Sequence, residues 1–371
     1  MTEPAIRHPG ELRWETRLLA VVTATLVVFG IAMVYGASSM VRTRGGGIVG
    51  GSYALNQFIG ALVGGLLMLV VARLDYRWLR PLAWPILLGT IALLIVTILP
   101  FTHAIAPVRN GARRWIELGP FTMQPSELAR LAVIIWCAML ATKKGDQVRE
   151  FKKGVMPFLV VLAFVSLLIL LQPNMSMAVL VALLGGIVLF AAGAKIGHFL
   201  LLGLGAVIGG LQLIQMAGYR ADRLDKFLNG AEGTSQIYQS LVGIGSGQLF
   251  GVGFGQGQQK LGYLPYAYSD FIFSTIGEEW GFLGVLLLVL LFGIFCWLGF
   301  RIARTAAVGV TAVMHMAVTL NLMPTTGLTL PFISFGRSSL VVSLVGTGIL
   351  LSIGRMRGKP EVRGPKRLRD G

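Results

Sequence analysis

The sequence predicts an all-α polytopic membrane protein with about ten transmembrane helices, both termini in the cytoplasm and a long outer loop between helices 7 and 8. Of the 371 residues, 55% are hydrophobic and 13% are charged, whereas soluble domains carry about 25% charged residues. A mean hydropathy of +0.75 leaves too little polar surface to cover a soluble globule. The apolar runs are roughly 16–21 residues long, which suits a spanning helix and is about twice the length of a membrane barrel strand.

The apolar runs place the helices along the chain. Lipid cannot hydrogen-bond the backbone, so each span must pair its own amides. The predicted spans are 18–37, 54–72, 82–99, 126–142, 156–172, 175–194, 199–217, 280–300, 306–323 and 338–354. A cleaved signal peptide is an alternative for the first run, since Ala37-Ser38-Ser39 supplies small residues. That run exceeds the usual apolar length of about 7–15 residues, so an uncleaved helix is favoured.

The basic residues predict the orientation and the domain boundaries. An even number of spans places both termini on one side, and that side carries 21 of the 32 Lys and Arg residues. Cytoplasmic loops are enriched in these residues, so both termini are predicted to be cytoplasmic. The chain then divides into a cytoplasmic N-terminal tail (1–17), a ten-helix membrane domain (18–354) and a basic cytoplasmic tail (355–371).

Ten basic residues fall on the outer side, where the topology gives no reason for them, and Arg130 lies within a helix. The ten are Arg42, Arg44, Arg109, Arg113, Arg114, Arg220, Arg223, Lys226, Lys260 and Arg337. Such a cluster at a membrane surface suits a phosphate or pyrophosphate group, and contact with anionic lipid head groups is the alternative. The net charge of +16 does not predict nucleic-acid binding, because it is spread over short loops between apolar runs.

The longest loop, 218–279, is predicted to be functional, as loops of that length in compact proteins usually are. Its glycine series is Gly243, Gly245, Gly247, Gly251, Gly253, Gly255 and Gly257. The series is not a dinucleotide-binding fingerprint, because no strand–turn–helix unit surrounds it. We interpret it as a re-entrant or tightly packed segment in which backbone approaches backbone.

The densest polar and aromatic group on the outer side centres on Asp270. Its members are Tyr263-Leu264-Pro265-Tyr266-Ala267-Tyr268-Ser269-Asp270-Phe271-Ile272-Phe273, followed by Glu278 and Glu279. The apolar residues that follow Asp270 would raise the pKa of its carboxyl group and make it a better base. Asp270 is equally well interpreted as a helix N-cap that accepts from backbone N–H groups. The two roles can coexist.

Three further polar groups lie at outer helix ends. They are Asn110-Gly111-Ala112-Arg113-Arg114-Trp115-Ile116-Glu117-Leu118-Gly119-Pro120 leading to Gln124-Pro125-Ser126-Glu127-Leu128-Ala129-Arg130, then Gln172-Pro173-Asn174, and Pro331-Phe332-Ile333-Ser334-Phe335-Gly336-Arg337-Ser338-Ser339. Ser126 is predicted to be an N-cap, with Glu127 in the first helical turn. Arg130 lies within pairing reach of Glu127, and a purely structural ion pair is the alternative. Pro324 and Pro331 predict broken helix at membrane depth, which is tolerated where it lines a cavity.

Several other kinds of site are not expected. Cys137 and Cys296 lie in apolar runs, which argues against a disulfide framework and a thiolate metal site. The histidines are too scattered for a zinc site. No P-loop is present, and no G-x-S-x-G motif with partners. The residues alone therefore predict an outward-facing site for an anionic, lipid-linked substrate.

These four groups together resemble the SEDS family of bacterial division, elongation and sporulation proteins. The matching motifs are Asn110-Gly111-Ala112-Arg113-Arg114-Trp115, Gln124-Pro125-Ser126-Glu127-Leu128-Ala129-Arg130, Tyr263-Leu264-Pro265 with Asp270-Phe271-Ile272-Phe273, and Pro331-Phe332-Ile333-Ser334 with Ser338-Ser339. They follow the family order over nearly the whole chain, with the expected ten spans. Residues 255–264 favour the septal division branch of the family over its elongation branch.

The resemblance implies a peptidoglycan glycosyltransferase. Family members polymerise lipid II on the outer face of the bacterial cytoplasmic membrane, together with a class B penicillin-binding protein and, in the septal branch, other divisome proteins. A lipid II flippase and a non-catalytic division scaffold are the alternatives. A transporter should carry polar residues through the bilayer midplane on several helices, whereas the charges here gather on the outer side.

The resemblance also implies roles for individual residues. Asp270 matches the essential aspartate of the family and would be the general base. The implied substrate-binding residues are Arg113, Arg114, Trp115, Glu127, Arg130, Lys260, Ser334, Ser338 and Ser339. Arginines or a divalent cation such as Mg²⁺ or Mn²⁺ would stabilise the leaving pyrophosphate, and no protein ligands for a metal are assigned.

Three positions depart from the family pattern. Asn174 stands where the family often has Asp, so a metal-ligand role there is in doubt. Tyr268-Ser269 replaces a common His-Thr, and Gly336-Arg337 replaces a common Gly-Gly. The last change adds a cation near the site.

Overall fold

The fold is a set of long helices, seen in a computed structural model that describes residues 11–39, 50–109, 111–119, 121–199, 203, 209, 236–303 and 329–356. The long helices are α1 (Glu11–Ser38), α2 (Gly50–Arg73), α3 (Leu79–Ile98), α4 (Pro125–Lys144), α5 (Met156–Leu171), α6 (Met175–Ala191), α9 (Gln236–Ser246), α10 (Ile272–Ala303) and α12 (Arg337–Met356). Short helices are η1 (Tyr76–Trp78), η2 (Gly145–Arg149), η3 (Phe151–Val155) and η4 (Gln259–Leu261), and the strands are β1 (Ile116–Leu118) and β2 (Phe121–Met123).

The helices confirm the membrane class. Within the described residues, seven helical stretches are long and apolar enough to cross a bilayer, and α6 is a shorter apolar helix. Two predicted spans, 199–217 and 306–323, lie almost wholly outside the described residues, as do residues 1–10 of the N-terminal tail and 357–371 of the C-terminal tail. The total of ten spans, the orientation and the domain boundaries therefore stay predictions.

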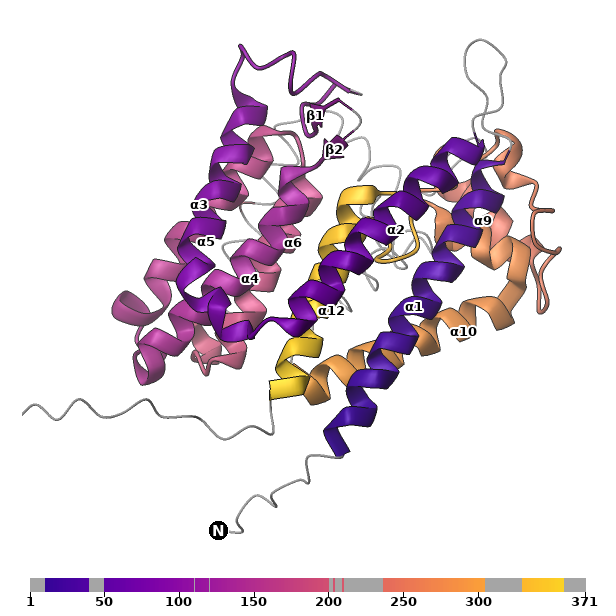
Figure 1. The fold of residues 1–371 in the computed structure, drawn as a ribbon. Helices are drawn as coiled ribbons and strands as arrows, with labels where there is room; N and C mark the ends of the chain where they lie inside the picture. The colour runs from indigo at the N-terminus through magenta and orange to yellow at the C-terminus, as the bar shows by residue number, and fades with distance from the viewer. Residues whose placement is uncertain are drawn as a thin grey trace, which may run out of the picture.

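The described helices gather into two groups, each with its own apolar core. Helices α3, α4, α5 and α6 form one group, and α1, α2, α10 and α12 form the other (Figure 1). The first core includes Trp136 and Phe158. The second core includes Phe273 and Phe292, and residues 330–333 contribute to it. Helices α4 and α12 contact each other where the two groups meet.

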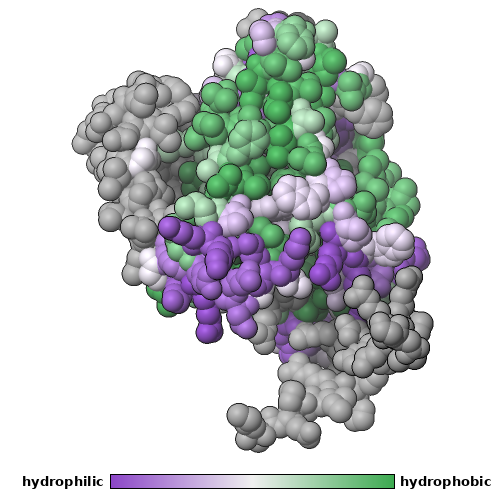
Figure 2. All heavy atoms as spheres, turned by 90° about the vertical axis from the view of Figure 1, so that its left-hand side faces the viewer, coloured by the Kyte–Doolittle hydropathy of each residue, from purple (hydrophilic) through white to green (hydrophobic). Residues whose placement is uncertain are grey.

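One end of the first group carries a polar belt. Figure 2 shows an apolar face that gives way to a hydrophilic belt towards the lower end of the view. The last turn of α4 carries Lys143 and Lys144, and η3 carries Lys152 and Lys153. Because this end is basic, the distribution agrees with the predicted cytoplasmic side.

Small residues let α2 and α12 approach closely. A Cβ atom on Gly64 would lie 2.7 Å from Leu344 Cδ1, and one on Gly348 would lie 2.7 Å from the carbonyl oxygen of Met68. Gly60 and Gly64 are spaced as a G-x-x-x-G pair, which favours helix contact in lipid. This packing holds α2 along α12 from Arg337 to Gly348.

The predicted outer loop is partly helical, and the predicted span 280–300 matches the part of α10 that follows a break at Gly281. Helix α9 lies inside the loop, and α10 begins at Ile272 because apolar and small residues there continue its pattern. Gly281 interrupts α10 with φ 64° and ψ −163°. The prediction of an all-α chain also missed the β1–β2 hairpin, in which Ile116 pairs with Met123 around a turn at Gly119.

The glycine series confirms close backbone packing. The amides of Val252 and Gly253 donate to the carbonyls of Glu278 and Glu279 at 3.0 and 3.1 Å. A Cβ atom on Gly251 would lie 2.2 Å from the carbonyl oxygen of Glu279. Gly251 also has φ 82°, in the left-handed region. The loop therefore pairs its backbone with the broken part of α10.

We expect Gly251→Ala to destabilise the protein, because the new methyl group meets the α10 backbone. Overpacking of this kind costs about 1–3 kcal/mol, and the positive φ adds strain. Thermal unfolding in detergent, followed by tryptophan fluorescence, should show a lower midpoint. Gly245→Ala is the control, since Gly245 lies in α9 with no atom within 4 Å of an added Cβ. Equal midpoints for the two variants would contradict the packing argument.

Candidate functional site

Asp270 lies in the turn that leads into α10. The residue is half-buried, and Ser269 Oγ donates to Asp270 Oδ1 at 3.0 Å. The next three residues are buried, so the apolar setting predicted from the sequence is present. The helix begins two residues later, at Ile272. Its roles as a base and as an N-cap both stay predictions.

A broken segment, residues 330–336, lies against this turn. Ser334 Oγ donates to the carbonyl oxygen of Ser269 at 2.8 Å and accepts from the amide of Leu330 at 2.9 Å. The amide of Phe335 donates to the carbonyl oxygen of Tyr268 at 3.0 Å. The non-helical backbone predicted from Pro331 is therefore present and joined to the Asp270 turn.

Helix α2 presents Tyr53 and Gln57 to both segments. The Tyr53 ring lies 4.7 Å from the Tyr268 ring and 4.9 Å from the Phe335 ring, centroid to centroid. Gln57 is fully buried and bonds Ser334 and Gly336. Burial, followed by a hydrogen bond with Tyr53, raises the pKa of Tyr268 well above its ordinary value. The phenol of Tyr268 therefore stays protonated to a higher pH than that of a free tyrosine.

The start of α12 is bonded to the β hairpin and to α4. Ser338 Oγ accepts from the amide of Gln124 at 3.1 Å and donates to the carbonyl oxygen of Thr122 at 3.3 Å. An Arg337 Nη2 donates to Thr122 Oγ1 at 2.9 Å. Ser339 Oγ accepts from Thr329 Oγ1 at 2.9 Å. These bonds join the motif around residues 331–339 to the segment that leads into α4, and so cross from one helix group to the other.

Glu127 and Arg130 form a buried ion pair on α4. Their charged groups lie 2.6 Å apart, and each side chain is less than a tenth exposed. The predicted pairing of these residues is confirmed. The prediction of Ser126 as the N-cap is wrong: Gln124 holds that position because Pro125 takes the first helical turn. Ser126 Oγ accepts instead from Gln124 Nε2 at 2.9 Å.

Arg130 also lines a cavity between the two helix groups. The cavity has a volume of about 650 Å³. Apolar residues of α4, α10 and α12 form most of its described wall, and Pro331 lies at it as well. Arg77 and Arg80, near the start of α3, line it too. It is therefore an apolar cavity with cations at separate places on its wall.

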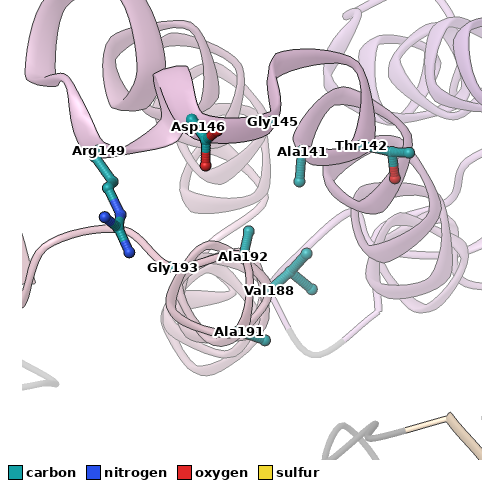
Figure 3. A pocket seen from close by; sticks show the side chains of 9 residues that line it. All are labelled: Ala141, Thr142, Gly145, Asp146, Arg149, Val188, Ala191, Ala192 and Gly193. Carbon is teal, nitrogen blue, oxygen red and sulfur yellow. The ribbon is translucent and has the colours of Figure 1, made fainter. Parts of the chain in front are cut away.

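A second cavity, of about 480 Å³, lies between the C-terminal ends of α4 and α6. Figure 3 shows its lining, with Asp146 and Arg149 on η2 and Val188 on α6. The described lining includes none of the predicted site residues. We therefore do not include this cavity in the candidate site.

Arg113 and Arg114 bond backbone carbonyls. Arg113 donates to the carbonyls of Ala106 and Leu99 at 3.0 and 2.7 Å, and to Thr102 Oγ1 at 2.8 Å. Arg114 donates to the carbonyl of Gln172 at 3.0 Å and to that of Pro173.

The contacts of Arg114 join the motif at residues 110–120 to the motif at residues 172–174. Trp115, the next residue, is half-buried. Asn174 caps α6 by accepting from the amide of Met177 at 3.4 Å. In the motif at residues 110–120, Asn110 and Pro120 lie outside the described residues.

Lys260 anchors the outer loop. Its ammonium group is buried, lies 2.8 Å from Glu279 Oε1 and donates to the carbonyl of Gly36 at 3.2 Å. Glu278 accepts from the amides of Gln258 and Gln259 at 2.7 and 3.2 Å. Lys260 therefore holds the loop to α1 and α10, and its predicted contact with substrate stays a prediction.

Sequence reasoning missed Gln57 and Tyr53. The available signal was a polar amide within an otherwise apolar span, which is costly in lipid and therefore has a partner or a function. The sequence could not show that its partners lie 277 and 279 residues away.

Comparisons with known sequences agree with the motifs. A family model described as the cell cycle proteins FtsW, RodA and SpoVE matches residues 16–359. A protein of Trichlorobacter lovleyi, named probable peptidoglycan glycosyltransferase FtsW, is 40% identical over 367 residues, with 94% of this chain and 95% of that protein covered. Stage V sporulation protein E of Bacillus subtilis is 37% identical over 366 residues, with 91% and 96% covered.

Solved structures agree as well. One chain comes from a structure described as "Structural coordination of polymerization and crosslinking by a peptidoglycan synthase complex". It matches with a TM-score of 0.74 at 26% identity, covering 92% of this chain and 98% of that one. The rod shape determining protein RodA of Thermus thermophilus matches with a TM-score of 0.64 at 27% identity, covering 92% and 97%. The chain belongs to the SEDS family of FtsW, RodA and SpoVE cell cycle proteins.

Proposed function

We propose that this protein is a peptidoglycan glycosyltransferase that polymerises lipid II on the outer face of the bacterial cytoplasmic membrane. One observation carries the proposal. Ser334 bonds the Asp270 turn and Ser338 bonds Gln124, so three of the motif groups meet at one place. Arg130 lines a cavity beside it. The curated relatives named peptidoglycan glycosyltransferase support the same activity. Most of these names are FtsW, which favours septal synthesis over the elongation role of RodA.

Asp270 would act as the general base. Its carboxylate takes the proton of the sugar 4-hydroxyl of the acceptor as that oxygen attacks the anomeric carbon of the growing chain. The bond from that carbon to the lipid pyrophosphate breaks, and the pyrophosphate leaves with the electron pair. Since the donor linkage is α and the product is β, one displacement with inversion accounts for the stereochemistry. General base catalysis of this kind contributes about 10²–10⁴-fold.

The leaving pyrophosphate needs fixed positive charge. Arg130 suits this role because it is buried, held by Glu127 and placed on the apolar cavity. A guanidinium group has five N–H donors in a rigid fork, so a single ion pair leaves it donors for a phosphate. Preorganised charge in such a setting stabilises the transition state more than mobile charge in water.

The described residues do not fit a protein-only metal site. They contain no group of three or more His, Cys, Asp or Glu side chains that could hold a metal. The Glu127 carboxylate is already paired with Arg130. A divalent cation such as Mg²⁺ or Mn²⁺, bound mainly by the pyrophosphate, stays a prediction, and no step of the proposed reaction uses it.

The proposed partner is a class B penicillin-binding protein, which supplies transpeptidation, together with other divisome proteins. The structural relative from a peptidoglycan synthase complex supports this partner. The runner-up function is a lipid II flippase, and one observation favours it: the cavity that reaches Arg130 also reaches Arg77 and Arg80. The bond from Ser334 to the Asp270 turn and the bond between Ser338 and Gln124 argue for the enzyme, because they join three motif groups at one junction.

We expect Asp270→Asn to lower glycan polymerisation at least about 100-fold, because the amide cannot accept the proton. The measurement is the length of chains formed from labelled lipid II by the purified protein with its penicillin-binding partner. Asp146→Asn, at an exposed position on η2, is the control. Full polymerisation by Asp270→Asn would rule out the general base. Lipid II transport by that variant in sealed vesicles would support the flippase.

We expect Arg130→Gln to destabilise the protein by about 3–5 kcal/mol, because it leaves the Glu127 carboxylate buried without a cation. The double variant Glu127→Gln/Arg130→Gln should recover most of that stability and still polymerise poorly. Thermal unfolding and the lipid II assay measure the two effects separately. Wild-type polymerisation by the double variant would show that the ion pair is structural alone.

A further inference from the structure

Gln57 places a buried amide against broken backbone. Its side chain lies on α2 and has no exposed surface. Nε2 donates to the carbonyl oxygen of Ser334 at 3.0 Å, and Oε1 accepts from the amide of Gly336 at 3.2 Å. Both halves of the amide therefore bind the same segment, residues 330–336. A side-chain amide is suited to this because it is both donor and acceptor.

Burying the Gln57 amide costs free energy unless the amide hydrogen-bonds the backbone. An apolar residue of similar size would pack between helices without the desolvation of a buried amide. However, the segment runs outside regular helix, so the carbonyl of Ser334 and the amide of Gly336 need partners at membrane depth. Gln57 supplies both, and thereby fixes the position of the segment relative to α2.

The fixed segment in turn holds the Asp270 turn. Ser334 Oγ donates to the carbonyl of Ser269, and the Phe335 amide donates to the carbonyl of Tyr268. Tyr53, one helical turn before Gln57, packs its ring against Tyr268. Two contacts from one face of α2 therefore reach the residues that directly precede Asp270, one of them through Ser334.

We propose that Gln57 is a positioning residue that sets the Asp270 carboxylate through residues 330–336. The proposal rests on the proposed function, in which Asp270 is the general base. Catalytic groups have to be held closely, and a displacement of about 1 Å can cost about 100-fold in rate. Loss of the Gln57 bonds should therefore lower turnover more than substrate binding.

The test uses Gln57→Met, which keeps the length of the side chain and removes both hydrogen bonds. With monodisperse full-length protein and its partner, we expect kcat for lipid II polymerisation to fall about 10- to 100-fold and KM to change less than about twofold. Thr347→Val is the matched control, because Thr347 is buried on α12 and bonds its own helix at Ser343. The control should polymerise at the wild-type rate.

Two further measurements separate positioning from loss of folded protein. A displaced base should move the acid limb of the kcat–pH profile, whereas fewer folded molecules would scale the profile without moving it. Hydrogen–deuterium exchange should rise in peptides covering 330–336 and 266–271 in Gln57→Met. A wild-type kcat, or faster exchange confined to 330–336 with an unmoved acid limb, would overturn the proposal.

Asp270→Asn in the same assays distinguishes the two proposals. If this variant stops polymerisation and keeps wild-type hydrogen–deuterium exchange, Asp270 is supported as the general base. The Gln57→Met result then tests the positioning role by itself. If Asp270→Asn polymerises, the proposed function fails. The positioning proposal, which is defined on that base, then fails with it, while the exchange data still show whether Gln57 holds the turn.

Discussion

The need to satisfy broken backbone between the membrane helices governs the structure around the site. Long apolar helices pair their own amides, but residues 330–336, the Asp270 turn and the loop before α10 do not lie in regular helix. Lipid offers no hydrogen bonds to replace those lost. Side chains supply these hydrogen bonds instead. Gln57 bonds the backbone of Ser334 and Gly336, and Glu278 accepts from a backbone amide of the loop.

This constraint explains why the site forms where the two helix groups meet. Each group has its own apolar core, and neither core supplies partners for the irregular segments that leave it. The bonds from Ser338 to the backbone of Thr122 and Gln124 cross from one group to the other. Polar residues therefore collect at the crossing, next to a cavity with apolar walls. Such a place can hold a lipid-linked anion and exclude water, which strengthens the electrostatic interactions within it.

Sequence reasoning predicted what depends on local spacing. The helix positions within the described residues, the Glu127–Arg130 pair and the close approach of the glycine series all follow from spacing and residue size, and the structure has them. It missed what depends on distant partners or on competition between caps. Pro125 displaced Ser126 from the cap position, and the helical residues 272–279 before the break at Gly281 were assigned to the loop. Counting charges placed Arg113 and Arg114 near the site, but no pattern in the sequence shows which carbonyls they bond.

Those carbonyl bonds change how the outer cations are interpreted. A guanidinium group that donates to three oxygens of the protein, as Arg113 does, has most of its fork occupied and is fixed by the fold. Arg130 is held by one ion pair and borders a cavity. Charge stabilisation needs a cation that is both rigid and able to reach the ligand. The geometry therefore favours Arg130 over Arg113 as the cation for the pyrophosphate. Arg113 instead stabilises the loop after α3.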